Sequence, residues 1–140
     1  MKSSEAIIQL FNQKGLKITP QRRLIFELLA EDESHPTAEE LYQLVISRMP
    51  DVSQTTVYNT LRELVALGEL APVENLSEAG ARFDTNTSNH HHLFCMHCHT
   101  LVDIEQDFPD VELTLEEAKG YQIVKNQVTF YGICQECQKI

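Results

Sequence analysis

Two cysteine pairs constrain this chain more than any other feature. Cys95 and Cys98 form one Cys-x-x-Cys pair, and Cys134 and Cys137 form another. Two residues between cysteines let both sulfurs of a tight turn point at one ion, and two such turns complete the tetrahedral thiolate set that Zn²⁺ prefers. The 35 residues between the pairs require the site to join two segments separated by a folded insertion. The pattern predicts a structural zinc site. The alternatives are two disulfides or four unrelated thiols, and disulfides do not suit a reducing compartment.

The chain length of 140 residues suits one ordinary domain or two small ones, and a hydrophobic content of 42% suffices for a packed core. A domain of half this length would be marginal alone, and a structural zinc would add on the order of 10 kcal/mol to its stability. Residues 1–30 lack the apolar core of a signal peptide, and no apolar run approaches about 18 residues. We therefore expect a soluble, cytoplasmic protein with no membrane association.

The net charge of −10 argues at first against a nucleic-acid partner. The charge is unevenly distributed, because residues 1–30 carry five basic and two acidic side chains whereas residues 31–80 carry two and ten. The basic side chains near the N-terminus include Lys14, Lys17, Arg22 and Arg23. Charge alone leaves the partner open.

The first 68 residues follow the period of four helices. The first is expected to end at Gly15 and the fourth at Gly68. The later three each begin with a hydroxyl side chain that can cap free N–H groups; these N-caps are Thr19, Thr37 and Ser53. Pro20 suits the first position of the second helix, which should stop within the acidic turn 31–34, and Glu40 completes a capping box with Thr37.

The third and fourth helices, joined by the short segment 49–53, have the lengths of a helix-turn-helix. The fourth would present side chains able to contact phosphates or base edges: Gln54, Thr55, Thr56, Tyr58, Asn59 and Arg62. We also expect Arg22, from the basic N-terminal segment, to contact DNA. A plain helical bundle with a solvated polar face is the alternative. Strands at 70–74 and 81–84 predict a hairpin behind this helix, which would make the motif winged and favours DNA binding.

Residues 85–89 show no periodicity and predict a hinge between a winged-helix DNA-binding domain (1–84) and a second domain (90–140). In the second domain the period changes to two, with short strands at 92–95 and 101–105, an acidic helix at 111–119 and a long strand at 121–131. This is a small α/β unit, so the chain as a whole is predicted to be α+β. The exposed edge of its sheet invites pairing with a second copy.

Histidines and carboxylates outside the cysteine set predict a second metal site. His90 and His92 alternate on one strand, so both rings point to the same face. Asp103 lies on the next strand, Asp84 ends the hairpin, and His35 precedes the third helix. Three imidazoles and two carboxylates suit iron, manganese, zinc or cobalt, and a metal held by both halves of the chain could lock the hinge. The alternative is a solvated histidine-rich strand with unrelated carboxylates. The remaining histidines are expected at the surface: His91, His97 and His99.

Six segments of the chain, in order and at matching spacing, resemble the ferric uptake regulator (Fur) family of bacterial metal-dependent repressors. They are GLKITPQR from Gly15, HPTAEELY from His35, TTVYNTLRELVALG from Thr55, RFD from Arg82, HHHLFCMHC from His90 and YGICQEC from Tyr131. The resemblance implies structural Zn²⁺ on the four cysteines, and a homodimer with Tyr58 and Arg62 on the DNA-reading helix. It also implies a regulatory Fe²⁺ or Mn²⁺ on a set of five residues: His35, Asp84, His90, His92 and Asp103.

Two departures from the family pattern narrow the interpretation. Asp103 stands where iron-sensing members usually carry glutamate, and aspartate there resembles the peroxide-regulator (PerR) branch. In that branch the resemblance points to oxidation of ligand histidines at the positions of His35 and His90. Asn89 and Asn126 stand where some members have histidines of a further metal site, which argues against that site here.

The sequence thus predicts a dimeric, metal-dependent transcriptional repressor that binds an inverted repeat in double-stranded operator DNA and senses hydrogen peroxide. An iron- or zinc-responsive uptake repressor without peroxide sensing is the alternative. Two histidines and a carboxylate also form the facial triad of non-haem iron oxygenases, but five candidate ligands leave little room for substrate, so we expect no enzyme. A zinc-stabilised protein-interaction module is a further hypothesis, which metal-dependent duplex binding would eliminate.

Overall fold

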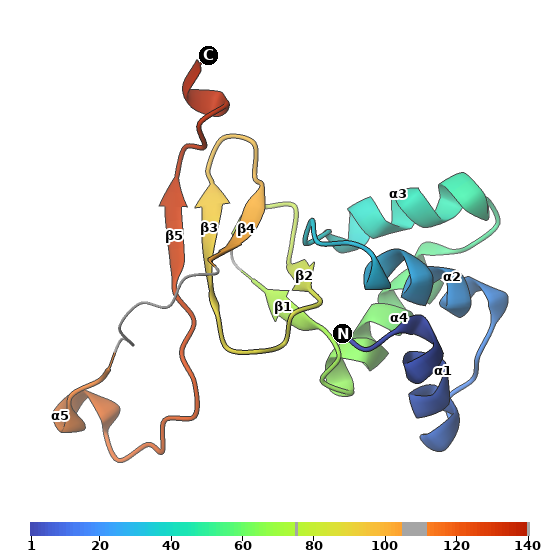
Figure 1. Ribbon diagram of the computed structural model, residues 1–140, viewed down its shortest axis with the longest axis horizontal. Coiled ribbons are helices and arrows are strands. Elements are labelled where there is room, and N and C mark those ends of the chain that lie inside the picture. Colours follow the sequence, from blue (N-terminus) through green and yellow to red (C-terminus); the bar gives the residue numbers. More distant parts are fainter. Residues whose placement is uncertain (75, 105–111, 140) are drawn as a thin grey trace. The chain divides into compact units, whose positions relative to one another are not determined.

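The computed structural model describes residues 1–74, 76–104 and 112–139, and the chain divides into two compact units, Met1–Thr87 and Ser88–Ile140. The N-terminal unit contains four helices and a hairpin, and the C-terminal unit contains a three-stranded sheet (Figure 1). The domain limits at residues 84 and 90 stay predictions. No helix in the described ranges is long and apolar enough to cross a membrane.

The helices of the N-terminal unit are α1 (Ser4–Gln13), α2 (Pro20–Ala30), α3 (Ala38–Arg48) and α4 (Gln54–Ala66). Each begins after a hydroxyl side chain that accepts a hydrogen bond from the backbone N–H three residues further on; these N-caps are Ser3, Thr19, Thr37 and Ser53. Such a cap contributes about 1 kcal/mol. The predicted caps of α2, α3 and α4 are confirmed, and Gly15 and Gly68 follow α1 and α4 with φ of 71° and 76°.

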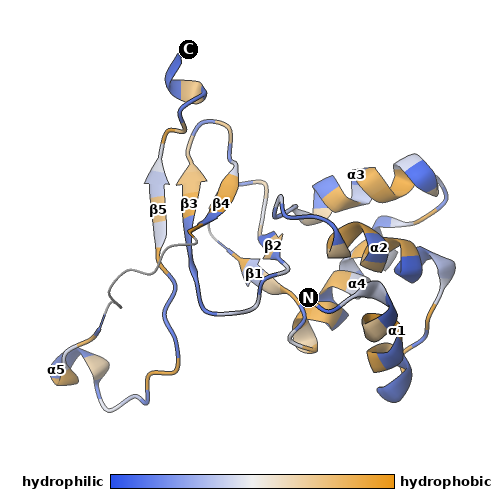
Figure 2. Ribbon diagram, viewed as in Figure 1, coloured by the Kyte–Doolittle hydropathy of each residue, from blue (hydrophilic) through white to orange (hydrophobic). Residues whose placement is uncertain are grey.

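The inner faces of these helices share one apolar core. Phe11 of α1 and Phe26 of α2 meet edge to face with ring centroids 4.8 Å apart, and both are fully buried. Val57, Leu61 and Leu64 bring the inner face of α4 into the same core. Apolar and polar residues alternate along the helices (Figure 2). The core therefore fixes α4 through one face and leaves its polar face at the surface.

The hairpin after α4 consists of β1 (Ala71–Val73) and β2 (Arg82–Asp84), which pair antiparallel. β2 also pairs with the segment before α3, because Phe83 donates its N–H to the Pro36 carbonyl at 2.9 Å and Thr37 forms a bridge with Arg82. The Glu40 side chain does not make the predicted capping-box contact with Thr37. Both carboxylate oxygens of Glu40, which a capping box would direct to Thr37, lie 3.2 and 3.4 Å from Nη1 of Arg82.

The C-terminal unit is built on the strands β3 (His91–Cys95), β4 (Leu101–Ile104) and β5 (Thr129–Gly132), in the order β4-β3-β5. β3 pairs antiparallel with β4, placing His92 opposite Asp103, and parallel with β5, placing Cys95 opposite Gly132. Its short helices are α5 (Leu115–Ala118) and the 3₁₀ turn η1 (Cys137–Lys139). The sheet therefore brings the two cysteine pairs to one end.

Two predicted elements of this unit are wrong in extent. The helix expected over 111–119 is a single turn, because Thr114 caps it at the Glu117 N–H and Lys119 ends it in the left-handed region; residue 111 lies outside the described residues. The strand expected over 121–131 begins only at Thr129. Alternation indicated extended backbone, but a strand needs a partner, and the ladder with β3 covers Thr129–Gly132 in the described residues.

Candidate metal centres and nucleic-acid surface

The four cysteine sulfurs converge in the C-terminal unit. All four sulfur atoms lie within 4.8 Å of one another, and the sulfurs of Cys98 and Cys134 are 3.9 Å apart. A zinc ion with four Zn–S bonds of about 2.3 Å spaces its sulfurs by about 3.8 Å, whereas a disulfide would hold two of them at about 2.05 Å. All four thiols are free of disulfides. The spacing fits a tetrahedral metal site.

Hydrogen bonds to the sulfurs prepare the cysteines for a cation. The backbone N–H groups of Cys134 and Cys98 donate to the Cys95 sulfur at 3.3 and 3.4 Å and lower the pKa of that thiol to about 5. The Thr100 hydroxyl, 3.2 Å from the Cys98 sulfur, lowers the pKa of Cys98. The neighbouring Cys134 sulfur raises the pKa of Cys137 to about 12. Four thiolates this close repel one another, and a divalent cation removes that repulsion.

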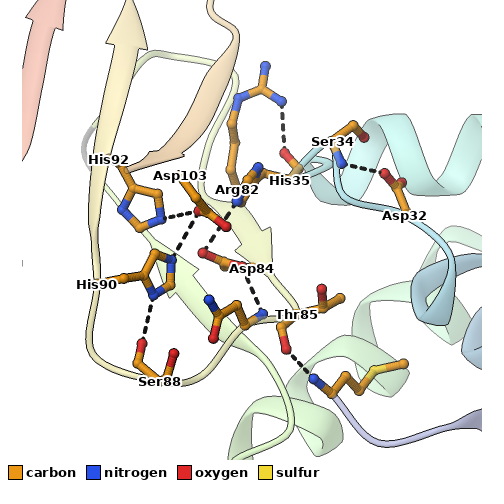
Figure 3. Close-up of polar contacts among 12 residues, drawn as sticks. Asp32, Ser34, His35, Arg82, Asp84, Thr85, Ser88, His90, His92 and Asp103 are labelled. Carbon is orange, nitrogen blue, oxygen red and sulfur yellow. Dashed lines mark hydrogen bonds and ion pairs between the residues drawn. The ribbon is translucent and has the colours of Figure 1, made fainter. Parts of the chain in front are cut away.

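Two histidines of the C-terminal unit point at one carboxylate. Nε2 of His90 lies 3.0 Å and Nε2 of His92 lies 3.2 Å from the same oxygen of Asp103 (Figure 3). The His92–Asp103 pairing across β3 and β4 places these two side chains opposite each other. The rings of His90 and His92 pack edge to face with centroids 4.5 Å apart. Three possible metal-ligand atoms, two imidazole nitrogens and one carboxylate oxygen, thus lie close together.

The two polar neighbours of the His90 ring, the Ser88 carbonyl and the Asp103 carboxylate, are both hydrogen-bond acceptors. Nδ1 of His90 lies 2.7 Å from the carbonyl oxygen of Ser88, and because a carbonyl only accepts, Nδ1 carries a proton. In the neutral ring Nε2 is then an acceptor, yet it faces the Asp103 carboxylate at 3.0 Å. Two acceptors at this distance need a cation, either a proton or a metal ion. A backbone carbonyl that fixes the tautomer is the usual support of a metal-binding histidine, and Ser88 gave no sequence signal for this role.

The N-terminal unit holds the other two predicted ligands together. Nε2 of His35 lies 3.3 Å from a carboxylate oxygen of Asp84, and both residues are buried. Asp84 also accepts a hydrogen bond from the backbone N–H of Asn86 at 2.8 Å. The pairing of β2 with the segment before α3 brings these residues, 49 positions apart, into contact. An imidazole and a carboxylate in this arrangement also fit a divalent metal.

The remaining histidines divide. The prediction that His91 lies at the surface is wrong: it is 8% exposed, and its Nδ1 accepts a hydrogen bond from the Val128 N–H at 2.8 Å. His91 therefore ties β3 to the segment before β5, a long-range pairing without local signal. His97 is exposed as predicted, and His99 is half-buried with its ring stacked on Phe94.

The outer face of α4 carries the predicted DNA-contacting side chains. Thr55, Tyr58, Asn59 and Arg62 are exposed, and their spacing of three to four residues places them along one stripe. Asn59 and Arg62 contact each other, with Nη1 of Arg62 3.4 Å from the Asn59 side-chain oxygen. Thr56 is half-buried, and its hydroxyl lies 2.9 Å from that of the N-cap Ser53.

Arg22 lies in a different setting. Its guanidinium forms a 2.7 Å ion pair with Glu63 of α4 and donates to the Lys17 carbonyl at 2.7 Å. Its side chain is 16% exposed and lies over the Phe11 ring. Arg22 thus holds α2 against α4, and we do not retain it among the proposed DNA contacts. The sequence pattern did not show that Glu63 would be its partner.

A winged helix-turn-helix followed by a small metal-binding α/β unit defines a metal-responsive regulator of transcription. The ferric uptake regulator family matches residues 13–131, and the chain belongs to that family, whose members are transcriptional regulators and not enzymes. The Peroxide-responsive repressor PerR of Staphylococcus aureus (strain Mu50) is 33% identical over 135 residues, covering 96% of this chain and 90% of that protein.

Solved structures show the same fold. The Helicobacter pylori ferric uptake regulator Fur superposes with a TM-score of 0.75 at 22% identity, covering 98% of this chain and 95% of that one. PerR from Streptococcus pyogenes superposes with a TM-score of 0.56 at 26% identity, covering 99% and 95%. A zinc-bound manganese uptake regulator superposes with a TM-score of 0.66 at 26% identity, covering 95% of this chain and 99% of that one. The predicted fold class, α+β with an N-terminal winged helix-turn-helix and a small C-terminal α/β domain, is confirmed.

Proposed function

We propose that this chain is a dimeric repressor that binds operator DNA when one metal ion occupies a regulatory site, and that it loses DNA on exposure to hydrogen peroxide. The ion is held by two groups of ligands, one from each unit: His35 with Asp84, and His90 with His92 and Asp103. The observation that carries this proposal is the convergence of Nε2 of His90 and Nε2 of His92 on one oxygen of Asp103, at 3.0 and 3.2 Å. Two imidazoles and a carboxylate directed at one point suit a divalent metal ion.

Metal occupancy controls DNA binding in this proposal because the ligands come from both sides of the hinge. A bound ion would restrict the motion of one unit against the other and so favour one arrangement of the reading helices. Removing one imidazole weakens the site and releases that restriction. The ion can shift this equilibrium only by its difference in affinity between the two arrangements.

The peroxide response rests on which histidines can be reached. Ferrous iron in the site would supply electrons to hydrogen peroxide and yield an oxidant that adds one oxygen to a nearby imidazole. The His90 side chain is 11% exposed and that of Asp103 27%, whereas His92 is fully buried. We therefore expect His90 rather than His92 to be oxidised in the C-terminal unit. His35 is also buried, and we propose it as a second target because of the resemblance to the peroxide-regulator branch and not because of its exposure. The 33% identity to a peroxide-responsive repressor supports this response.

The C-terminal unit would form the dimer and hold the structural Zn²⁺ on Cys95, Cys98, Cys134 and Cys137. Its sheet presents apolar side chains around a hollow of about 550 Å³, among them Leu93, Val102 and Phe130. Large apolar side chains also lie exposed before β5, where Tyr121 is 77% and Val124 is 88% exposed. Exposed apolar side chains of this kind mark a contact with another protein surface, and a second copy of this chain is the partner we propose.

In the dimer, the stripe on α4 would read the major groove. Tyr58 and Arg62 are the contacts we propose for base edges or phosphates, with Thr55, Thr56 and Asn59 beside them. A twofold dimer pairs with an inverted repeat whose half-sites lie about one helical turn apart, ~34 Å, or a multiple of it.

A metal-responsive uptake repressor without peroxide sensing is the second candidate. The TM-score of 0.66 with a manganese uptake regulator exceeds that of 0.56 with PerR from Streptococcus pyogenes at the same 26% identity. Such a regulator would use the same ligands and dimer but would keep its DNA in the presence of peroxide.

The two candidates separate in one experiment. Protein loaded with Fe²⁺ or with Mn²⁺ is exposed briefly to hydrogen peroxide, and operator binding is measured by fluorescence anisotropy alongside peptide mass spectrometry. We expect the iron form alone to lose DNA and to gain one oxygen on peptides containing His35 or His90. His97→Ala, which removes an exposed histidine of the same unit, is the control and should behave as the parent protein. Retention of DNA by both metal forms would reject peroxide sensing and leave the second candidate. Equal loss in both forms, or oxygen only on Met or Cys, would reject iron-catalysed oxidation of the ligand histidines.

A further inference from the structure

The backbone of the ligand residue His35 is held in an unusual conformation. Its φ is +56°, in the left-handed region that residues with a Cβ disfavour. The residue is 5% exposed and is followed by Pro36, which leads into α3. Such a conformation persists only where surrounding contacts determine it.

Arg82 contacts the backbone of His35 directly. Its Nη1 donates a buried hydrogen bond to the His35 carbonyl at 2.9 Å (Figure 3). Arg82 and Asp84 lie two residues apart on β2, so their side chains leave the strand on the same face. The strand thus contacts both ends of His35: Arg82 reaches its carbonyl, and Asp84 reaches its ring nitrogen at 3.3 Å.

Arg82 is itself fixed from two directions. Glu40, in the first turn of α3, places its carboxylate oxygens 3.2 and 3.4 Å from the same Nη1. The Arg82 backbone forms a bridge with Thr37, and the next residue, Phe83, donates its N–H to the Pro36 carbonyl at 2.9 Å. The Arg82 side chain is 10% exposed. A buried guanidinium held in this way has little freedom, so it can hold another group in turn.

We infer that Arg82 is a positioning residue for the regulatory metal site: it binds no metal but sets the backbone of His35 so that the imidazole meets Asp84. Supporting contacts of this kind typically affect metal affinity by about 10- to 100-fold. The inference rests on the proposed role of His35 as a ligand. It also connects the ligand pair to α3, because Glu40 and Thr37 belong to the start of that helix.

The chain offers a matched control. Arg22, like Arg82, donates to one backbone carbonyl and pairs with one glutamate of a helix. Both Arg22 contacts are 2.7 Å long, and its side chain is only 16% exposed. Its partners, Lys17 and Glu63, are not among the proposed ligands. Arg22→Met should therefore lower the stability of the same unit without touching the site.

The experiment uses the full zinc-containing chain without regulatory metal and compares four variants: Arg82→Met, Arg82→Lys, Glu40→Gln and Arg22→Met. Amide hydrogen exchange at Phe83 reports the pairing of β2 with the His35 segment, competition titration reports Mn²⁺ affinity, and calorimetry reports stability. We expect Arg82→Met to speed exchange at Phe83 and to weaken Mn²⁺ binding about 10- to 100-fold. Arg82→Lys should restore part of the protection from exchange at Phe83 and part of the Mn²⁺ affinity. Glu40→Gln should lower the Mn²⁺ affinity only a few-fold, because Arg82 still reaches His35. Arg22→Met should lose stability alone.

Mn²⁺ affinity within twofold of the parent in Arg82→Met, or an equal loss in Arg22→Met, would overturn the inference. If Arg82→Met fails to fold, exchange at Phe83 and Mn²⁺ affinity are compared in Arg82→Lys and Glu40→Gln instead. Unchanged exchange and unchanged Mn²⁺ affinity in both variants would reject the inference. His35→Ala separates the two levels of the argument. Weakened Mn²⁺ binding in His35→Ala but not in Arg82→Met overturns the inference alone. Unchanged binding in His35→Ala overturns the proposed ligand set, and the inference with it.

Discussion

Replacing Cys134 with Ser should unfold the C-terminal unit while the N-terminal unit stays folded. The described residues explain the difference. The shared apolar core lies entirely within the N-terminal unit, whereas the buried apolar side chains of the C-terminal unit are Phe94, Cys95 and Leu101 in the part of the chain that the structure describes. Burial of Phe94 and Leu101 contributes about 3–6 kcal/mol together. A structural zinc contributes about 10–16 kcal/mol, which is the larger amount.

The four sulfurs also support one another. They lie within 4.8 Å, and the Cys134 N–H donates to the Cys95 sulfur, so removing one thiolate opens the coordination set and leaves three ligands with weaker affinity. A loss on the order of 10 kcal/mol would exceed the total stability of many domains, which is about 5–15 kcal/mol. We therefore expect loss of zinc, of the fold of residues 88–140 and of the dimer together.

Three measurements on Cys134→Ser test this expectation. Elemental analysis gives the zinc content, sedimentation gives the oligomeric state, and hydrogen exchange resolved by peptide distinguishes the two units. Met96→Ser is the matched control, because Met96 lies between Cys95 and Cys98 but is 58% exposed; it should keep zinc and fold. A Cys134→Ser protein that is zinc-free yet dimeric, with unchanged exchange over residues 88–140, would refute a structural role for the metal.

Three further predictions concern the other parts of the molecule. Tyr58→Ala and Arg62→Ala should each weaken operator binding by about 1–3 kcal/mol without changing metal content, measured by fluorescence anisotropy at several salt concentrations; undiminished binding in both would exclude α4 as the reading helix. Asp103→Glu, whose longer side chain changes the ligand geometry, should keep Mn²⁺-dependent DNA binding but reduce the loss of DNA after peroxide treatment of the iron form. Unaltered peroxide sensitivity in this variant would contradict a role for the shorter aspartate side chain. Phe26→Ala should lower the free energy of unfolding of the N-terminal unit by about 3–5 kcal/mol in urea titrations, and a change below 1 kcal/mol would show that this core packs loosely.

The sequence determined the features that depend on neighbours along the chain. A hydroxyl before each helix caps the N–H three residues on, so Thr19, Thr37 and Ser53 marked the starts of α2, α3 and α4 correctly. Two cysteines three positions apart bring their sulfurs together within one turn, so the sulfur cluster was also predictable. The alternation of His90 and His92 predicted that they share a face, and both point at Asp103.

Only the tertiary structure decided which distant groups meet. Pairing of β2 with the segment before α3 turned Glu40 from its expected capping partner to Arg82 and set Arg82 on the His35 carbonyl. Pairing with β3 limits the last strand to Thr129–Gly132, and a hydrogen bond from the Val128 N–H holds His91 in a buried position. Each of these contacts joins residues at least 37 positions apart, as His91 and Val128 are. No periodicity of a single segment records such a contact, because the free energy that selects it comes from packing two segments at once.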